Sequence, residues 1–176
     1  MAPLPPTPAE KTLRRVLLIA ALDGWSVIAV AGLGVLLTLL LGDLSGLLVG
    51  ALVLTGGVLE LRGRGRLLRR DATGMRLMAR AQLLMLSVIL VYCVSRLGSF
   101  DSETVLSSLT PEMEAMLKES GVERADLLPL VQIAFYSTYA TAALASLLFQ
   151  GGLALYYRNR AGLVATALAD AQTPLA

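Results

Sequence analysis

Apolar residues gather into four long runs along this chain, and short polar segments separate them. The first run extends over 16–41 and the second over 44–61. The third covers about 78–97 and the fourth about 129–157. A helix needs roughly 20 residues to cross a hydrocarbon core of about 30 Å, and the runs approach or exceed that length. The pattern predicts an all-α integral membrane protein, a four-transmembrane-helix bundle.

The segments outside the runs complete the predicted organisation. Residues 1–12 are rich in proline, and we expect them to form a disordered cytoplasmic tail. The four-helix transmembrane domain covers 13–160, and 161–176 form a second cytoplasmic tail. An outer loop over 98–128 separates the third and fourth runs.

The outer loop carries signals for a short helix. Thr110 is suited to an N-cap, Pro111 to the first helical position and Gly121 to a C-terminal stop. The fourth run begins at Pro129, which we expect in the first turn of its helix. The sequence thus predicts a short helical element before the last span.

Charge predicts how the spans are oriented. Short cytoplasmic loops retain Lys and Arg. Basic residues lie in the first tail, in the connection after the second run and behind the fourth run, whereas the outer loop is mainly acidic. We therefore expect both termini on the cytoplasmic side, and the small size suits a bacterial inner membrane.

Two alternatives concern the first run. It could be a cleaved signal peptide, with Ala29, Val30 and Ala31 as the cleavage site. Asp23 inside the run and the apolar residues beyond that site favour a retained span. The first run could also start with an interfacial helix over 11–22 that is hinged at Gly24, although a continuous tilted helix is preferred.

Small residues form a stripe along the second run. Gly46, Gly50 and Gly57 fall on one helix face, and the first two make a Gly-x-x-x-Gly motif. Missing side chains let another helix approach closely and gain dispersion contacts. We expect this stripe to pack against the first span; self-association between protomers is the alternative.

Asp23 and Glu60 are the ionisable residues placed at membrane depth. Such groups are functional candidates because exposing them to lipid costs several kcal/mol. They could form an acidic ring or proton relay at the inner mouth of an assembled pore. The preferred interpretation is that Glu60 pairs with Arg80 and Asp23 with another arginine of the same loop, which would fix the helix register.

The third and fourth runs each carry a seven-residue repeat of positions that tolerate polar side chains. The main polar members are Gln82 and Tyr92 in the third run and Gln132, Tyr136, Tyr139 and Gln150 in the fourth. This spacing favours a left-handed seam. We expect an intramolecular, hydrogen-bonded interface between the two spans, with Gln82 and Gln150 in its cytoplasmic half. Alternatively, one stripe lines a wet path between protomers.

The connection after the second run is strongly basic. Its first arginines are Arg62, Arg64, Arg66, Arg69 and Arg70. At a membrane surface they are expected to bind anionic lipid headgroups, at about 1 kcal/mol per residue. Membrane topology explains these charges, so no nucleic-acid partner is expected.

The remaining composition argues against catalysis. The chain is 56% hydrophobic and 16% charged, with no histidine and one cysteine. Cys93 lies inside an apolar run, and neither a cofactor, a metal site nor an activated nucleophile is predicted. Two function classes remain. One is a homo-oligomeric channel or transporter subunit that moves a small solute or cation. The other is a non-transporting scaffold or accessory subunit that binds lipid or a partner membrane protein.

Overall fold

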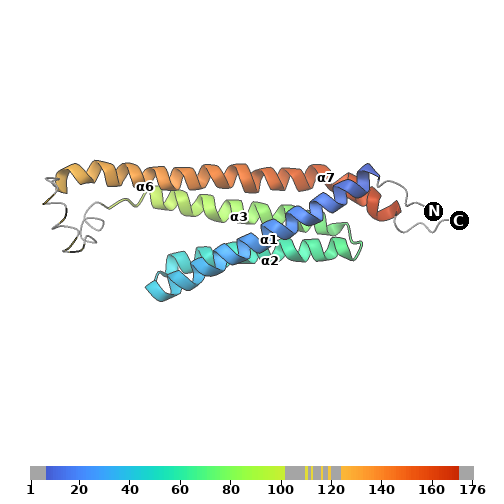
Figure 1. Cartoon of the computed structure of the whole chain (residues 1–176), viewed down its shortest axis with the longest axis horizontal. Coiled ribbons are helices and arrows are strands. Elements are labelled where there is room, and N and C mark those ends of the chain that lie inside the picture. Colours follow the sequence, from blue (N-terminus) through green and yellow to red (C-terminus); the bar gives the residue numbers. More distant parts are fainter. Residues whose placement is uncertain are drawn as a thin grey trace. The chain divides into compact units, whose positions relative to one another are not determined.

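The structure is a computed structural model that describes residues 7–101, 110, 112, 116, 119 and 124–170. The helices in chain order are α1 (Pro8–Leu41), α2 (Leu44–Leu68), α3 (Thr73–Leu97), α6 (Arg124–Ser146), the π-helix η1 (Leu147–Gly151) and α7 (Gly152–Asp170) (Figure 1). Among the described residues, four helical segments are long and apolar enough to cross a membrane: α1, α2, α3 and the continuous stretch Leu127–Asp170. The predicted fold class, all-α with four membrane-spanning helices, is confirmed.

The chain divides into two compact units. Unit 1 comprises Met1–Ile89 and Ser146–Ala176, and unit 2 comprises Leu90–Ala145. Unit 1 therefore holds α1, α2, most of α3, η1 and α7. Unit 2 holds the end of α3 and nearly all of α6.

Capping residues fix the ends of the α1–α2 hairpin. The Thr7 hydroxyl accepts from the Glu10 backbone N–H while the Glu10 carboxylate accepts from the Thr7 N–H, a capping box that starts α1. The helix therefore includes residues 8–12, which were expected in the tail. Gly42, with φ of 69°, ends α1 in the left-handed conformation that glycine adopts without steric cost. Asp43 then caps α2 through the amides of Ser45 and Gly46.

Other helices also extend beyond the predicted spans. α2 continues to Leu68, past the expected end of its apolar run at residue 61. α7 continues to Asp170, so most of the segment expected as a C-terminal tail is helical. Val164 and Leu168 are buried there, because this last part of α7 packs on α1.

Pro129 occupies a different helical position from the predicted one. α6 begins at Arg124, so Pro129 lies inside the helix and not in its first turn. Proline at such a position removes one backbone hydrogen bond. The short helix predicted from Thr110 to Gly121 falls largely outside the described residues.

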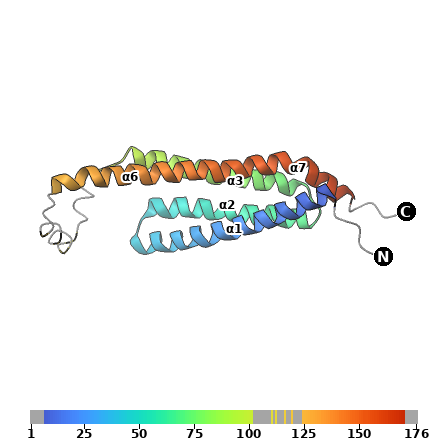
Figure 2. The same cartoon turned by 45° about the horizontal axis from the view of Figure 1, so that its top comes forward.

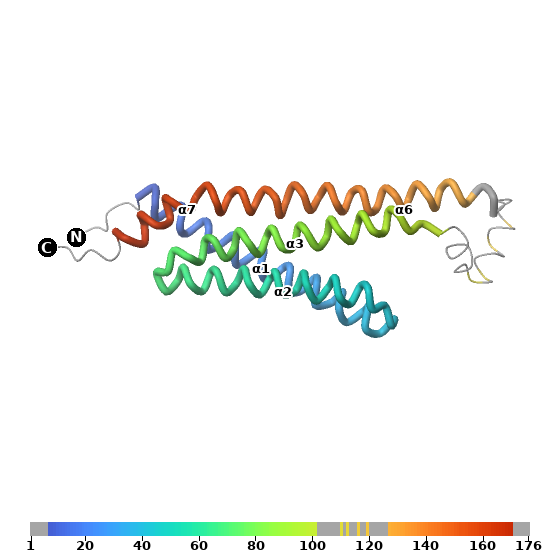
Figure 3. Tube along the Cα trace, turned by 180° about the vertical axis from the view of Figure 1, so that it is seen from behind, coloured from blue at the N-terminus to red at the C-terminus, as the bar shows by residue number. Residues whose placement is uncertain are grey.

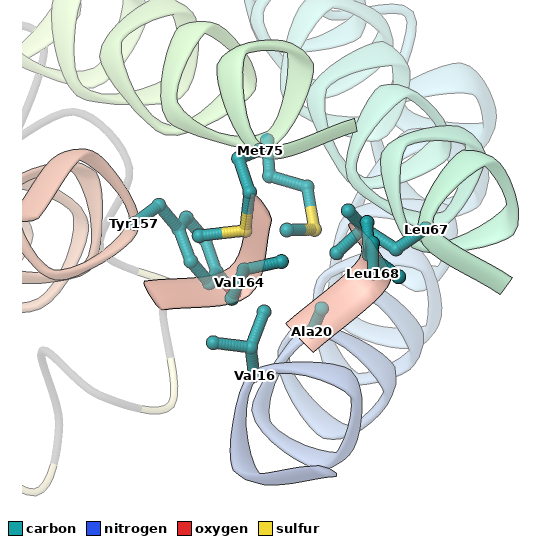
Figure 4. Close-up of a cluster of buried hydrophobic side chains, with 8 residues drawn as sticks. Val16, Ala20, Leu67, Met75, Tyr157, Val164 and Leu168 are labelled. Atoms are coloured by element: carbon teal, nitrogen blue, oxygen red, sulfur yellow. The ribbon is translucent and has the colours of Figure 1, made fainter. Parts of the chain in front are cut away.

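A cluster of buried apolar side chains holds four helices of unit 1 together. Figure 4 shows these side chains, with Tyr157 at one edge of the cluster and Val164 near its middle. The members are Val16 and Ala20 of α1, Leu67 of α2, Met75 and Met78 of α3, and Tyr157, Val164 and Leu168 of α7. The N-terminal part of α1, the α2–α3 connection and the last part of α7 therefore meet at one end of unit 1 (Figures 1 and 2). We call this the arginine end, after residues 62–70.

α1 and α2 lie side by side as an antiparallel hairpin (Figure 3). The glycine stripe of α2 faces α1. A methyl group added to Gly50 would lie 2.8 Å from Cγ2 of Val35, and one on Gly57 would lie 3.0 Å from Cγ1 of Val27. Gly46 similarly faces Thr38. These positions need glycine because larger residues would push the helices apart.

The outer surface of unit 1 carries large apolar side chains. Leu40 is 82% exposed, Leu41 81% and Val30 73%. Contiguous apolar surface of this kind is unfavourable in water but matches a hydrocarbon environment. The surface therefore agrees with an integral membrane protein.

Candidate functional site: a buried carboxylate cluster

A close approach of α1 and α2 brings Asp23 and Glu60 to the same level. A methyl group on Gly57 would lie 3.3 Å from the Gly24 carbonyl oxygen, and one on Gly24 would lie 2.7 Å from Cδ2 of Leu61. Asp23 precedes Gly24, and Glu60 follows Gly57 by about one helical turn. The absence of side chains at the two glycines thus lets both carboxylates reach the bundle interior.

Gln82 joins the two carboxylates. Its Nε2 atom donates to Oδ2 of Asp23 at 2.6 Å and to Oε2 of Glu60 at 2.8 Å. The Tyr157 hydroxyl donates to the other Glu60 oxygen, Oε1, at 2.6 Å. These four residues come from α1, α2, α3 and α7, and we call them the carboxylate cluster.

The carboxylate cluster is enclosed by protein. Glu60, Gln82 and Tyr157 are 0% exposed, whereas Asp23 is partly exposed. Two carboxylates around one amide nitrogen repel each other strongly where the dielectric constant is low. One added proton or small cation between the two carboxylates would relieve this repulsion.

An orphaned oxygen belongs to the same cluster. Oε1 of Gln82 is buried and has no hydrogen-bond partner among the described residues. Hard cations bind to carbonyl and carboxylate oxygens. No group of three or more His, Cys, Asp or Glu side chains is arranged to hold a metal ion in the parts of the chain that the structure describes.

The arginine partners expected for Asp23 and Glu60 are replaced by other members of the carboxylate cluster. Glu60 bonds to Gln82 and Tyr157, and Asp23 bonds to Gln82, so the expected pairing of Glu60 with Arg80 is corrected. The physical reason is position, because Arg80 is exposed on α3 whereas Gln82 lies on the buried face.

The polar stripe of the third span faces a different neighbour from the predicted one. A methyl group on Gly56 would meet Met85, and one on Gly63 would meet Met78, so this face of α3 packs against α2. Gln82 lies on the same face and bonds across to α1 and α2, not to Gln150. In η1, Oε1 of Gln150 is buried without a hydrogen-bond partner among the described residues.

Tyrosines of the predicted stripes meet as an aromatic group within unit 2. Tyr92 contacts Tyr139 edge to face, with ring centroids 6.0 Å apart. Tyr136 lies against Phe100 at 5.8 Å. Gln132 is exposed and takes no part in these ring contacts. The tyrosines are therefore brought together by ring contacts and also by polar ones, since Tyr92 and Tyr139 share a side-chain hydrogen bond and the Tyr92 hydroxyl accepts from Nε of Arg96 at 3.3 Å.

The arginines of α2 have separate environments. Arg64 donates from Nε to the Leu17 carbonyl oxygen at 3.2 Å and so links α2 to α1. Arg66 donates to the Thr73 hydroxyl at 3.4 Å. Arg62, Arg66 and Arg69 are exposed and line an open depression of about 570 Å³. Arg70 lies in the following turn with φ of 63°.

Tyr157 belongs to the predicted polar stripe of the fourth span, but it was not predicted as a candidate site residue. A buried tyrosine hydroxyl normally has a hydrogen-bond partner. This rule indicates from the sequence that Tyr157 bonds to some polar group. It could not name Glu60 as the partner, because the two residues lie 97 positions apart. No protein-family model matches this chain, and neither a curated protein nor a solved structure shows significant similarity to it.

Proposed function

We propose that the protein is a channel or transporter subunit in which the carboxylate cluster carries a proton or a small cation. The observation that supports this proposal is the meeting of Asp23 and Glu60 at one Gln82 nitrogen without an arginine partner. Ionisable groups inside a membrane bundle are costly and commonly mark ion pathways or proton relays. If the contact were purely structural, apolar side chains would pack there without the cost of desolvating two carboxylates.

The cluster suggests an order of events. Asp23 is the partly exposed carboxylate and exchanges the positive charge with solvent, whereas Glu60 is the enclosed one. Gln82 donates to both carboxylates from its one amide nitrogen and transmits a change at one carboxylate to the other. Tyr157 fixes the second oxygen of Glu60. The titratable groups that meet here are thus Asp23 from α1, Glu60 from α2 and Tyr157 from α7.

The proposed working form is a homo-oligomer. Four spans enclose little space for a continuous path, and the exposed apolar surface offers area for contacts with further copies. The proposed location is a bacterial inner membrane with both termini cytoplasmic, because the basic segments belong on that side.

Flux measurements on liposomes test the proposal. The purified full-length chain is reconstituted, and proton and potassium flux are followed for the wild type, Asp23→Asn and Glu60→Gln. Both variants should lose the flux, because the amides cannot exchange a proton or neutralise a cation. Asp43→Asn is the matched control: it removes one carboxylate at the α1–α2 turn, and asparagine also caps helices well.

The control should keep wild-type flux. Loss of flux in all three variants, or wild-type flux in folded D23N and E60Q, would overturn the assignment. Size measurement in mild detergent tests the oligomer separately.

The second candidate is a non-transporting scaffold or accessory subunit. It is favoured by the hydrogen bonds that tie α1, α2, α3 and α7 together, since enclosed polar networks specify a unique packing. In that case the wild type passes neither cation, and the cluster variants lower only the resistance to unfolding. Copurification of a partner membrane protein would then be the informative experiment.

A further inference from the structure

A groove runs between α3 and α7 within unit 1 and reaches the core residues Met75 and Tyr157. Its volume is about 430 Å³. Three arginines line it: Arg76 and Arg80, which are one turn apart on α3, and Arg158 on α7. All three are exposed. The other lining residues are apolar except for Tyr157, and no acidic residue of the described chain lines the groove.

The charged and apolar parts of the groove follow a direction. The arginines lie toward the arginine end of unit 1, near the start of α3. Leu83 lies about one turn further along α3 than Arg80, and Leu155 and Gly151 precede Arg158 on the antiparallel α7. Guanidinium groups therefore line the groove near the arginine end, and apolar side chains line it further into the bundle.

The three guanidinium groups are available to a ligand. None of them donates a hydrogen bond to another part of the described chain. Guanidinium groups bind phosphate with parallel, charge-assisted hydrogen bonds. Basic pockets between membrane helices recognise anionic lipid headgroups. The adjoining apolar walls match an acyl chain, which a free inorganic anion lacks.

We propose that this groove is a binding site for one anionic phospholipid, whose phosphate is held by Arg76, Arg80 and Arg158 and whose acyl chain lies along Leu83 and Leu155. The site is distinct from Arg62, Arg66 and Arg69, which line a separate depression. The proposed lipid site does not depend on the proposed transport function. The ring of Tyr157 lines the groove while its hydroxyl holds Glu60, so the bound lipid also contacts the carboxylate cluster through one residue.

Native mass spectrometry of the full-length chain in mild detergent tests the site. The probes are dioleoylphosphatidylglycerol, dioleoylphosphatidylcholine and inorganic phosphate. The variant R76Q/R80Q/R158Q removes the proposed headgroup contacts. The matched control R14Q/R15Q/R160Q removes the same number of exposed positive charges from α1 and α7 and leaves the groove intact. Circular dichroism establishes that each variant is folded.

The wild type should bind one phosphatidylglycerol molecule in preference to phosphatidylcholine. Each headgroup contact changes affinity roughly fivefold, so the groove variant should lose most of this preference while the control keeps it. If the two triple variants lost this preference equally, general surface charge would explain the binding, and the proposed site would be overturned. Equal binding of the two lipids by the wild type would also overturn it.

A second variant tests the apolar half of the groove. Ala79 lines it, and Ala79→Phe keeps all three arginines while filling the space beside them. Phosphatidylglycerol binding should fall in A79F. If binding is unchanged, or if inorganic phosphate competes as well as the lipid does, the occupant is not a phospholipid in the groove. A partner helix on this face would instead appear as a protein complex that the groove variants disrupt.

Discussion

At the scale of single residues, the molecule depends on polar side chains that bond to one another inside the helix bundle. Glu60 accepts from Tyr157 and Gln82, and Gln82 also reaches Asp23. Each donor in this cluster satisfies an oxygen that is buried or partly buried. Removing a donor should therefore cost more than the modest net value of an ordinary hydrogen bond, because the oxygen left behind stays desolvated.

Tyr157→Phe should destabilise the protein by about 1–3 kcal/mol, the usual cost of leaving a buried acceptor unpaired. The aromatic ring remains, so apolar packing is kept. Unfolding in mixed detergent and sodium dodecyl sulfate micelles measures the difference. Tyr156→Phe is the matched control, since the Tyr156 hydroxyl makes no hydrogen bond within the described chain. Equal stability of Y157F and Y156F would contradict the role given to the hydroxyl.

Asp71, in the turn between α2 and α3, gives a pH prediction. The Thr73 hydroxyl donates to its Oδ2 at 2.7 Å and the Thr73 backbone N–H to its Oδ1 at 2.9 Å. These bonds, followed by the charges of Arg66 and Arg76, hold the pKa of Asp71 below its usual 3.8. A lowered pKa in the folded state means that the carboxylate stabilises the fold above its unfolded pKa. That contribution disappears as pH falls from 3.8 through the folded value.

Asp71→Asn should therefore reduce the loss of thermal stability on acidification below pH 3.8. Thermal unfolding midpoints at neutral and acidic pH, compared between wild type and D71N, provide the measurement. Thr73→Ser keeps the hydroxyl and should behave as the wild type does. An identical acid response in wild type and D71N would show that Asp71 is not linked to folding.

At the scale of helices, glycines decide how closely the elements of unit 1 approach. The tightest contact with a backbone atom is between α2 and α3, where a methyl group on Gly74 would meet the backbone oxygen of Gly63. A methyl group on Gly63 would lie 2.9 Å from the Gly74 oxygen. Backbone atoms cannot move aside as a side chain does, so this crossing requires glycine on both helices. Gly65, two residues further along α2, faces open space.

Gly74→Ala should destabilise the protein by about 1–3 kcal/mol, the typical cost of overpacking. Gly65→Ala adds the same methyl group where nothing lies within 4 Å. It should be neutral or stabilising by up to about 1 kcal/mol, because alanine favours a helix more than glycine does. Micelle unfolding of both variants provides the comparison. If G65A is as harmful as G74A, helix contact is not the cause.

At the scale of the whole molecule, the connectivity of unit 1 places its charged segments. The start of α1, the α2–α3 turn and the last part of α7 meet at the arginine end, while the α1–α2 turn lies at the opposite end of the hairpin (Figures 1 and 2). In a bilayer crossed by these helices, the two ends would reach opposite surfaces. The basic residues would then occupy one surface together.

Single-cysteine labelling in membrane vesicles tests this arrangement. In a Cys93→Ala background, Ala72→Cys and Arg160→Cys should react with an impermeant maleimide from the same side. Ser45→Cys should react from the other side. All three positions are exposed, so failure to react reports the side of the membrane and not burial. Labelling of S45C from the same side as A72C would contradict the predicted topology.

Much of the fold can be predicted from the sequence because a span is a local property. Length and hydropathy over about 20 residues are sufficient to recognise each membrane helix. Helix ends were predicted less well, because they depend on local caps such as Thr7 with Glu10 and on later packing such as that of Leu168. The buried position of Leu168 extends α7 through residues that hydropathy alone would leave outside the span.

The sequence by itself determined the membrane class, the four apolar helices and Asp23 and Glu60 as candidates, because each follows from residues that are neighbours in the chain. Only the tertiary structure decided the partners of those carboxylates. Gln82 lies 59 positions from Asp23 and Tyr157 lies 97 from Glu60. Which faces of four apolar helices meet depends on close packing through glycines on separate elements. Hydropathy along one helix carries no information about that choice, since lipid and a neighbouring helix are similarly apolar.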